Sequence, residues 1–368
     1  MPVEASQQDS RIFVTDCEGP ISKNDNAFEL TRYLIPSGDK FYSLISKYDD
    51  VVADVIKKPG YKAGDTLRLI LPFLKAYGAT NNRIKDFSSK NVLLVPGARD
   101  TLQFVNALMP SFIVSTSYEQ YISSLCQLTK FPFGNTYCTH LNMDNYGIDE
   151  KERKRLHELR LEIVALPMIT IPKHSCPVED LSQRDQETIQ RLDEIFWEEI
   201  SGMESGRMLR EVNPVGGSEK AKAVQNIVKK LDTTLDRVIY VGDSITDVQP
   251  LRLIRENGGL AVSFNGNDYA VRESEIAVLS GNTIVTSVLA ESFSRIGKNQ
   301  LLNLVEVWNP LGLQKYRVNL TLNKRMLTLY PDGFPKVERI TADNMERLKR
   351  ESSLFRKSVR GEAIGKLG

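Results

Sequence analysis

The part of this chain that most constrains its fold is residues 11–20, RIFVTDCEGP. The apolar run predicts a short buried strand, and that strand ends at a carboxylate, Asp16. Ligands bind at the carboxyl edge of open α/β sheets, so Asp16 and Glu18 stand where a ligand is expected. Gly19 lets the chain leave the strand at an angle that other residues resist. Because such short patterns recur by accident, the alternative is that both acids only solvate a turn.

A second stretch, residues 238–247 (VIYVGDSITD), repeats this design. It predicts a buried strand, a glycine turn and then Asp243 and Asp247. Two such strands in one sheet would gather three or four carboxylates, which is costly unless a cation lies among them. Oxygen ligands suit a hard ion such as Mg²⁺. The sequence therefore predicts a metal site formed by Asp16, Asp243 and Asp247, with Glu18 contributing its backbone carbonyl.

Strand and helix patterns alternate along much of the chain, which predicts an α/β protein. Further strands are expected at 112–114, 135–139, 260–264 and 276–279. Residues 21–90 are mostly helical in pattern and too long for a simple connection, so we expect a helical insertion standing over the sheet edge. Residues 316–330 alternate in a way that predicts a hairpin, followed by a charged helix at 342–360 that frays toward the end of the chain.

These patterns divide the chain into four parts. Residues 144–210 form two charged, amphipathic helical segments around a turn-rich stretch, and their alternating charges are typical of solvated helix faces. We expect this segment and the tail to form a second cap, a homodimer interface or a docking surface. The expected parts are a catalytic core (10–20, 91–143 and 211–300), a helical cap (21–90), a charged helical insertion (144–210) and a C-terminal extension (301–368).

Composition excludes several classes of protein. Lys plus Arg number 48 against 47 for Asp plus Glu, which gives no electrostatic argument for nucleic acid or an anionic membrane as partner. The four cysteines have no metal-binding spacing, which favours reduced thiols over zinc or disulfides. The polar first ten residues do not resemble a signal peptide, residues 1–10 are expected to be a loose tail, and no apolar run is long enough to span a membrane. We therefore expect a cytoplasmic protein.

Two further candidates complete a set suited to phosphoryl transfer. Ser115 and Thr116 follow the strand at 112–114, and Lys220 lies at the start of a predicted helix. Asp16 can attack phosphorus and form an aspartyl phosphate, while Glu18 protonates the leaving oxygen and later deprotonates water. Ser115 and Thr116 can donate hydrogen bonds to phosphoryl oxygens, and Lys220 can offset their charge. Mg²⁺ would let an anionic nucleophile approach an anionic phosphate.

Each of these residues has a simpler interpretation when it is taken alone. Ser115 and Asp247 could cap the helices that follow them, and a lysine at a basic helix start is more often solvated than catalytic. The order of all the candidates along the chain, each beside a strand end or helix start, favours the catalytic interpretation.

The set as a whole resembles the haloacid dehalogenase (HAD) superfamily, through DCEGP, IVSTS, Lys220 of GGSEK and GDSITD. The resemblance covers residues 10–290 and implies a Rossmann-like parallel sheet, caps that control access, Mg²⁺ and phosphatase activity. The insertion after the first motif lies where phosphoserine-phosphatase-like members carry a helical cap. Charged residues of that insertion, such as Arg32, Lys40 and Arg68, are then candidates for substrate recognition. The DCEGP opening also resembles archaeal members linked to energy-converting hydrogenase A.

This chain departs from the superfamily pattern at two positions of its first motif. The usual second acid is Asp, whereas Glu18 stands here, as in enolase-phosphatase-like members, and Pro20 replaces a more common Thr or Val. We expect a Mg²⁺-dependent phosphatase, a phosphoric monoester hydrolase, acting on a small phosphorylated metabolite. The alternatives are an accessory or regulatory protein of the same fold with little turnover, or a phosphotransferase.

Overall fold

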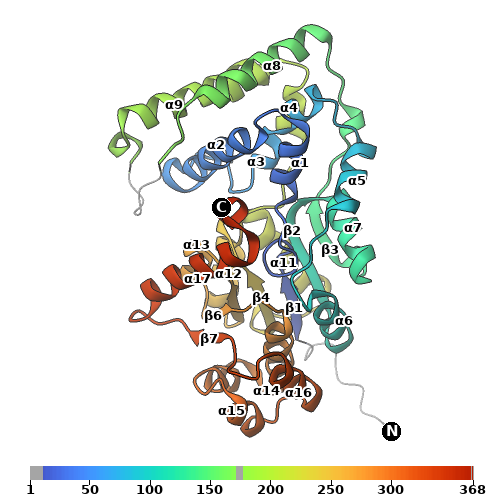
Figure 1. Cartoon of the computed structure of the whole chain (residues 1–368), viewed down its shortest axis with the longest axis vertical. Helices are drawn as coiled ribbons and strands as arrows, with labels where there is room; N and C mark the ends of the chain where they lie inside the picture. The colour runs from blue at the N-terminus through green and yellow to red at the C-terminus, as the bar shows by residue number, and fades with distance from the viewer. Residues whose placement is uncertain (1–10, 171–176, 366, 368) are drawn as a thin grey trace.

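The computed structural model describes residues 11–170, 177–365 and 367, and its centre is a seven-stranded sheet in the order β3-β2-β1-β4-β5-β6-β7 (Figure 1). Every neighbouring pair is parallel except β6 and β7. The predicted α/β fold with a largely parallel sheet is confirmed. The strands are β1 (Ile12–Thr15), β2 (Ser111–Tyr118), β3 (Thr136–Thr139), β4 (Val238–Gly242), β5 (Leu260–Phe264), β6 (Ile276–Leu279) and β7 (Lys336–Arg339).

The strand order reverses between β1 and β4. From β1 the chain moves outward through β2 to β3, then returns to place β4 on the other side of β1. Beside such a reversal the loops that follow the two strands diverge and leave a crevice at the carboxyl edge of the sheet. This crevice is where the residues that follow β1 and β4 meet.

Alternate residues of the strands pack on opposite faces of the sheet, as the pleat of a strand requires. Phe13 and Ile239 belong to an apolar cluster with helices α6 and α14 on one face. Ile12 and Tyr240 belong to a second cluster with α11 and α12 on the other face. Strands buried on both faces explain the continuous apolar runs in the sequence. The helices around the sheet are α6 (Ala98–Leu108), α7 (Glu119–Thr129), α11 (Ser218–Lys230), α12 (Val248–Glu256), α13 (Asp268–Glu273) and α14 (Ile284–Val305).

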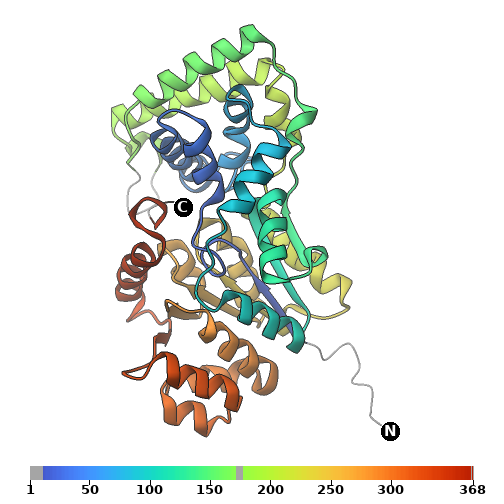
Figure 2. The same cartoon turned by 45° about the vertical axis from the view of Figure 1, so that its right-hand side comes forward.

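The helices of the two insertions lie together at the end of the molecule opposite α15 and α16 (Figures 1 and 2). One apolar cluster includes side chains from both, among them Phe41 and Phe73 of the first and Leu159 and Phe196 of the second. The second insertion thus packs on the first. The first holds α1 (Asn26–Leu34), α2 (Gly38–Asp50), η2 (Val51–Ile56), α3 (Thr66–Leu69), α4 (Leu71–Ala76) and α5 (Asn81–Lys90); the second holds α8 (Glu150–Ala165), α9 (Gln183–Asp193), η6 (Glu194–Glu199), η7 (Ile200–Gly202) and α10 (Gly206–Glu211).

The hairpin predicted for residues 316–330 is wrong. This stretch begins just after α15 (Pro310–Lys315) and forms α16 (Leu320–Leu329), whose first turn is capped by the Asn319 side chain. Leu322 and Met326 are buried against the core, whereas Leu320 is 76% exposed. The four-residue spacing of the buried side chains is helical, so tertiary packing overrides the alternation seen in sequence.

The segment after α16 completes the sheet. The antiparallel strand β7 joins the edge of β6, and α17 (Met345–Arg360) and α18 (Glu362–Gly365) follow it. The predicted helix at 342–360 is confirmed as α17, but its last turns bury side chains in the crevice instead of fraying.

Three cysteines, Cys17, Cys126 and Cys138, are free and buried. Cys176, His174 and the expected tail at residues 1–10 lie outside the described residues. Within the described part of the chain, none of the helices combines the length and apolar character needed to cross a membrane.

Candidate active site

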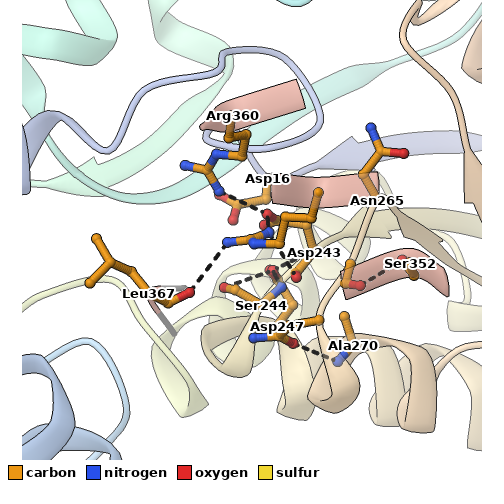
Figure 3. Close-up of polar contacts among 12 residues, drawn as sticks. Asp16, Asp243, Ser244, Asp247, Asn265, Ala270, Ser352, Arg360 and Leu367 are labelled. Atoms are coloured by element: carbon orange, nitrogen blue, oxygen red, sulfur yellow. Dashed lines mark hydrogen bonds and ion pairs between the residues drawn. The ribbon is translucent and has the colours of Figure 1, made fainter. Parts of the chain in front are cut away.

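The two acidic motifs meet at the reversal between β1 and β4. The strands pair in register up to Thr15 and Val241, and the Asp16 backbone N–H donates to the Val241 carbonyl at 2.8 Å. Carboxylate oxygens of Asp16, Asp243 and Asp247 all lie within 4.8 Å of one another, and all three residues are buried (Figure 3). Segments more than 200 residues apart in the chain therefore supply a single cluster of carboxylates.

Lys220, at the start of α11, is fully buried between two members of this acidic cluster. Its Nζ lies 2.8 Å from Asp16 Oδ2 and 2.8 Å from Asp247 Oδ1. Burial by itself lowers the pKa of Lys220, but the two carboxylates outweigh this effect and raise it above its usual value. Lys220 is therefore a permanent cation beside the predicted nucleophile.

Asp247 is held rigidly by its hydrogen bonds. Besides Lys220, Tyr240 Oη donates to Oδ1 at 2.7 Å, and the backbone N–H groups of Asp243 and Ser244 donate to Oδ2 at 3.0 and 3.1 Å. Burial alone would raise the pKa of Asp247, but Lys220 and these donors outweigh it and lower that pKa. The carboxylate remains ionised.

For Asp16 the effects that raise the pKa outweigh those that lower it. Its Oδ1 accepts from the Cys17 backbone N–H at 2.7 Å and its Oδ2 faces Lys220. Burial, followed by the charge of Asp247, nevertheless raises the pKa of Asp16 to about 8. The single charge of Lys220 does not offset the burial of Asp16 and the nearby charge of Asp247. A divalent cation would favour the ionised, nucleophilic form of Asp16.

Asp243 offers an oxygen for such a cation. Its Oδ2 pairs with Arg356 and Arg360, whereas its buried Oδ1 has no hydrogen-bond partner among the described residues. A buried carboxylate oxygen without a donor is costly, and three converging carboxylates are the oxygen donor set that Mg²⁺ favours. The residues present fit a Mg²⁺ site.

Glu18 lies apart from the carboxylate cluster. Its Oε1 accepts from the backbone N–H of Asn26 at 2.6 Å, at the start of α1. Burial, followed by the charge of Asp25, raises the pKa of Glu18 well above its usual value, which favours the protonated form of this carboxyl group. Ligation through its backbone carbonyl stays a prediction.

Ser115 and Thr116 line a cavity together with Asp16 and Asp243. Ser115 Oγ accepts from the Ser117 backbone N–H at 3.2 Å, and Thr116 Oγ1 is buried without a hydrogen-bond partner in the described structure. Both hydroxyls are thus available to donate to a ligand oxygen.

The cavity has a volume of about 90 Å³ and lies between the sheet edge and the helices of the first insertion. This volume is small beside the roughly 300–1,000 Å³ of pockets that take drug-sized ligands. Asp25, Asp49 and Thr66 line it from the insertion. The cavity suits a small ligand held between insertion and core.

Sequence reasoning did not find Arg356 and Arg360, which come from α17 and line the same cavity. Their four-residue spacing places both on one helix face, and this was the only local signal. Because α17 carries several other basic residues, the sequence alone does not single out these two.

The cap residues proposed for substrate recognition lie elsewhere. Arg32 and Lys40 are exposed, and Arg68 pairs with Asp65 and donates to the Leu209 carbonyl at 3.1 Å. None of the three is among the residues that line the cavity between insertion and core in the described structure.

The chain is similar to a known protein family and to a solved structure. Residues 107–268 match the family of haloacid dehalogenase-like hydrolases, which confirms the resemblance seen in the motifs. The solved structure of gene product AF1437 from Archaeoglobus fulgidus is similar over 98% of this chain and 99% of that chain, with 25% identity and a TM-score of 0.79. No curated protein sequence matches the chain.

Phosphoserine phosphatase structures also align, with lower scores. A substrate-bound complex has a TM-score of 0.44 and 11% identity, and a phospho-aspartyl intermediate analogue has a TM-score of 0.42 and 9% identity. Each alignment covers 76% of this chain and 97% of the other.

Proposed function

We propose that this haloacid dehalogenase-like hydrolase is a Mg²⁺-dependent phosphatase that hydrolyses a small phosphorylated metabolite through an aspartyl phosphate on Asp16. The observation that carries the proposal is the position of Asp16 at the strand reversal, 2.8 Å from Lys220 and within 4.8 Å of Asp243 and Asp247. Nucleophile, cation and metal-binding acids are thus side by side, as phosphoryl transfer requires.

Asp16 acts as the nucleophile and Glu18 as the general acid and base. In the first step an Asp16 oxygen forms a bond to phosphorus, the ester oxygen leaves, and protonated Glu18 gives that oxygen its proton. In the second step Glu18 takes a proton from water as the water oxygen attacks phosphorus, and the bond from phosphorus to Asp16 breaks. The high pKa of buried Glu18 supports its role as the acid of the first step.

The other residues stabilise charge on the transferring group. Lys220 lies beside Asp16, and the hydroxyls of Ser115 and Thr116 can donate to phosphoryl oxygens. Mg²⁺ held by Asp16, Asp243 and Asp247, and by the backbone carbonyl of Glu18, would offset the charge between nucleophile and phosphate. The small cavity supports a compact substrate.

The test is hydrolysis of p-nitrophenyl phosphate by wild type and Asp16→Asn, with and without Mg²⁺. Because an amide is no nucleophile, we expect Asp16→Asn to lower kcat at least about a thousandfold, and removal of Mg²⁺ to stop the wild type. Asp39→Asn, at an exposed position early in α2, is the control and should retain wild-type kcat. Equal turnover by Asp16→Asn and wild type would contradict the proposal.

A further inference from the structure

We propose that Arg356 and Arg360 of α17 compete with the divalent cation for Asp243, so that release of this carboxylate by the end of α17 strengthens ion binding. The inference rests on the metal site of the proposed function and is independent of hydrolysis. In this inference the end of α17 regulates how much of the metal site is occupied.

The competition follows from the contacts of one carboxylate oxygen. Arg356 Nη1 donates to Asp243 Oδ2 and, at 3.2 Å, to the Asp243 backbone carbonyl. Arg360 Nη1 lies 3.1 Å from the same Oδ2 (Figure 3). The side chains of both arginines are at most 5% exposed. Two guanidinium groups thus converge on a carboxylate that we assign to the metal.

Positive charge already surrounds these carboxyl groups without an ion. Lys220, Arg356 and Arg360 bring three positive charges to Asp16, Asp243 and Asp247. A divalent ion added to this arrangement would meet two guanidinium groups close by in a buried, weakly screened site. Once the arginines leave Asp243, the same carboxylates carry an excess negative charge that favours the ion.

The arginine contacts also leave polar atoms unsatisfied. Asp243 Oδ1 and Arg356 Nε are both buried without a hydrogen-bond partner among the described residues. Each buried polar atom without a partner costs free energy, which weakens the pairing of Arg356 with Asp243. A divalent cation that binds Asp243 can therefore displace the arginine.

The middle of α17 is held by an apolar contact, whereas the arginines at its end are held by polar contacts. Leu348 is fully buried in an apolar cluster with β6, and Ser352 Oγ donates to the Gly266 carbonyl at 2.6 Å. Beyond Ser352, Arg360 reaches the carbonyls of Lys23 and Asn24, both in the segment that follows β1. Release of Arg356 and Arg360 from Asp243 therefore breaks polar contacts, while Leu348 stays in its apolar cluster and Leu367, beyond the helix, stays packed in the cluster of the two insertions.

The first experiment is calorimetric titration of the full chain with Mn²⁺ in phosphate-free buffer. We expect the double variant Arg356→Gln/Arg360→Gln to bind Mn²⁺ at least about tenfold more tightly than wild type, because two competing cations are removed. Arg350→Gln, the same substitution at an exposed position on the same helix, removes one positive charge away from the site and should remain within about twofold of wild type. Adding Asp243→Asn to the double variant should abolish the gain.

Equal or weaker Mn²⁺ binding by the double variant would overturn the inference. If neither wild type nor the double variant binds Mn²⁺, both this inference and the metal site of the proposed function fail. If Mn²⁺ binding follows the expectation but Asp16→Asn retains its phosphatase turnover, only the proposed function fails.

A second measurement needs no substitution and so does not depend on a variant that folds. We expect hydrogen exchange of the wild-type chain to show faster exchange in residues 356–360 when Mn²⁺ saturates the site, with residues 348–352 unchanged. Unchanged protection of residues 356–360 under saturating Mn²⁺ would contradict the competition.

Discussion

A buried lysine is the residue on which the acidic cluster most depends. Lys220 is fully buried and shared by Asp16 and Asp247, so its charge offsets carboxylates that have little access to water. Removing one partner of a buried ion pair leaves the other charge uncompensated, which costs more than the pair contributes.

We therefore expect Lys220→Met to lower the free energy of unfolding by about 3–5 kcal/mol, measured by urea denaturation at pH 7. Lys222→Met is the matched control, since Lys222 is largely exposed and pairs with Glu219 on the same helix; it should change stability by less than about 1 kcal/mol. A loss below about 1 kcal/mol in Lys220→Met would show that the cluster does not need this cation.

Asp49 should make stability depend on pH. Burial, followed by the charge of Asp50, raises the pKa of Asp49 from 3.8 to about 6. Between about pH 4 and 6 the folded chain then holds a proton that the unfolded chain has lost, so the free energy of unfolding falls as pH rises through this window. A shift of this size corresponds to about 3 kcal/mol.

The variant Asp49→Asn should remove this dependence. Its amide oxygen can still accept the bonds that Asp49 Oδ2 receives from Gly64 N, Thr66 N and Thr66 Oγ1. Relative to wild type, we expect its free energy of unfolding to gain about 2–3 kcal/mol between pH 4 and pH 7.5, measured by urea denaturation across that range. A constant difference between the two chains would refute the assignment.

At the scale of elements, the loop after β1 and the loop after β4 are packed too closely for a side chain between them. Gly19 has φ +107°, and a Cβ added there would lie 2.1 Å from Asp243 Oδ2. Gly19 thus permits a backbone with positive φ and lets Asp243 approach.

Gly60 distinguishes backbone strain from the close approach of Asp243. It also has a positive φ (+78°), but a Cβ added there would lie in open space. We expect Gly60→Ala to cost about 1–2 kcal/mol from backbone strain alone. Gly19→Ala should cost at least about 2 kcal/mol more, because Asp243 must move, and it should also weaken Mn²⁺ binding. Urea denaturation and calorimetric titration measure the two effects; equal losses in both variants would show that the close approach is unimportant.

At the scale of the whole molecule, two insertions far apart in sequence share one apolar core. Tyr48 Oη in α2 donates to Asp193 Oδ1 at 2.7 Å and accepts from Trp197 Nε1 at 2.8 Å. Phe196 is fully buried and packs near Tyr48 and Phe73, with ring centroids 5.8 and 6.3 Å away. Neither insertion buries these side chains without the other.

We expect Phe196→Ala to lower the free energy of unfolding by about 3–5 kcal/mol, as for other large buried aromatic side chains. Hydrogen exchange should show α2 and α8 losing protection together, because they share the core. Leu161→Ala is the control, since Leu161 is 59% exposed on α8, and should change stability by about 0.5 kcal/mol or less. Loss of protection in α8 alone would show that the insertions fold separately.

The sequence by itself determined the strands of the parallel sheet, the α/β class and the acidic residues at the ends of β1 and β4. A buried strand and the turn after it are encoded by neighbouring residues, so Asp16 and Asp243 were visible as local patterns. Only the tertiary structure decided that α16 is a helix, that the two insertions share a core, and that Arg356 and Arg360 reach Asp243. These features depend on contacts between residues distant in the chain, which the local spacing of residues does not specify.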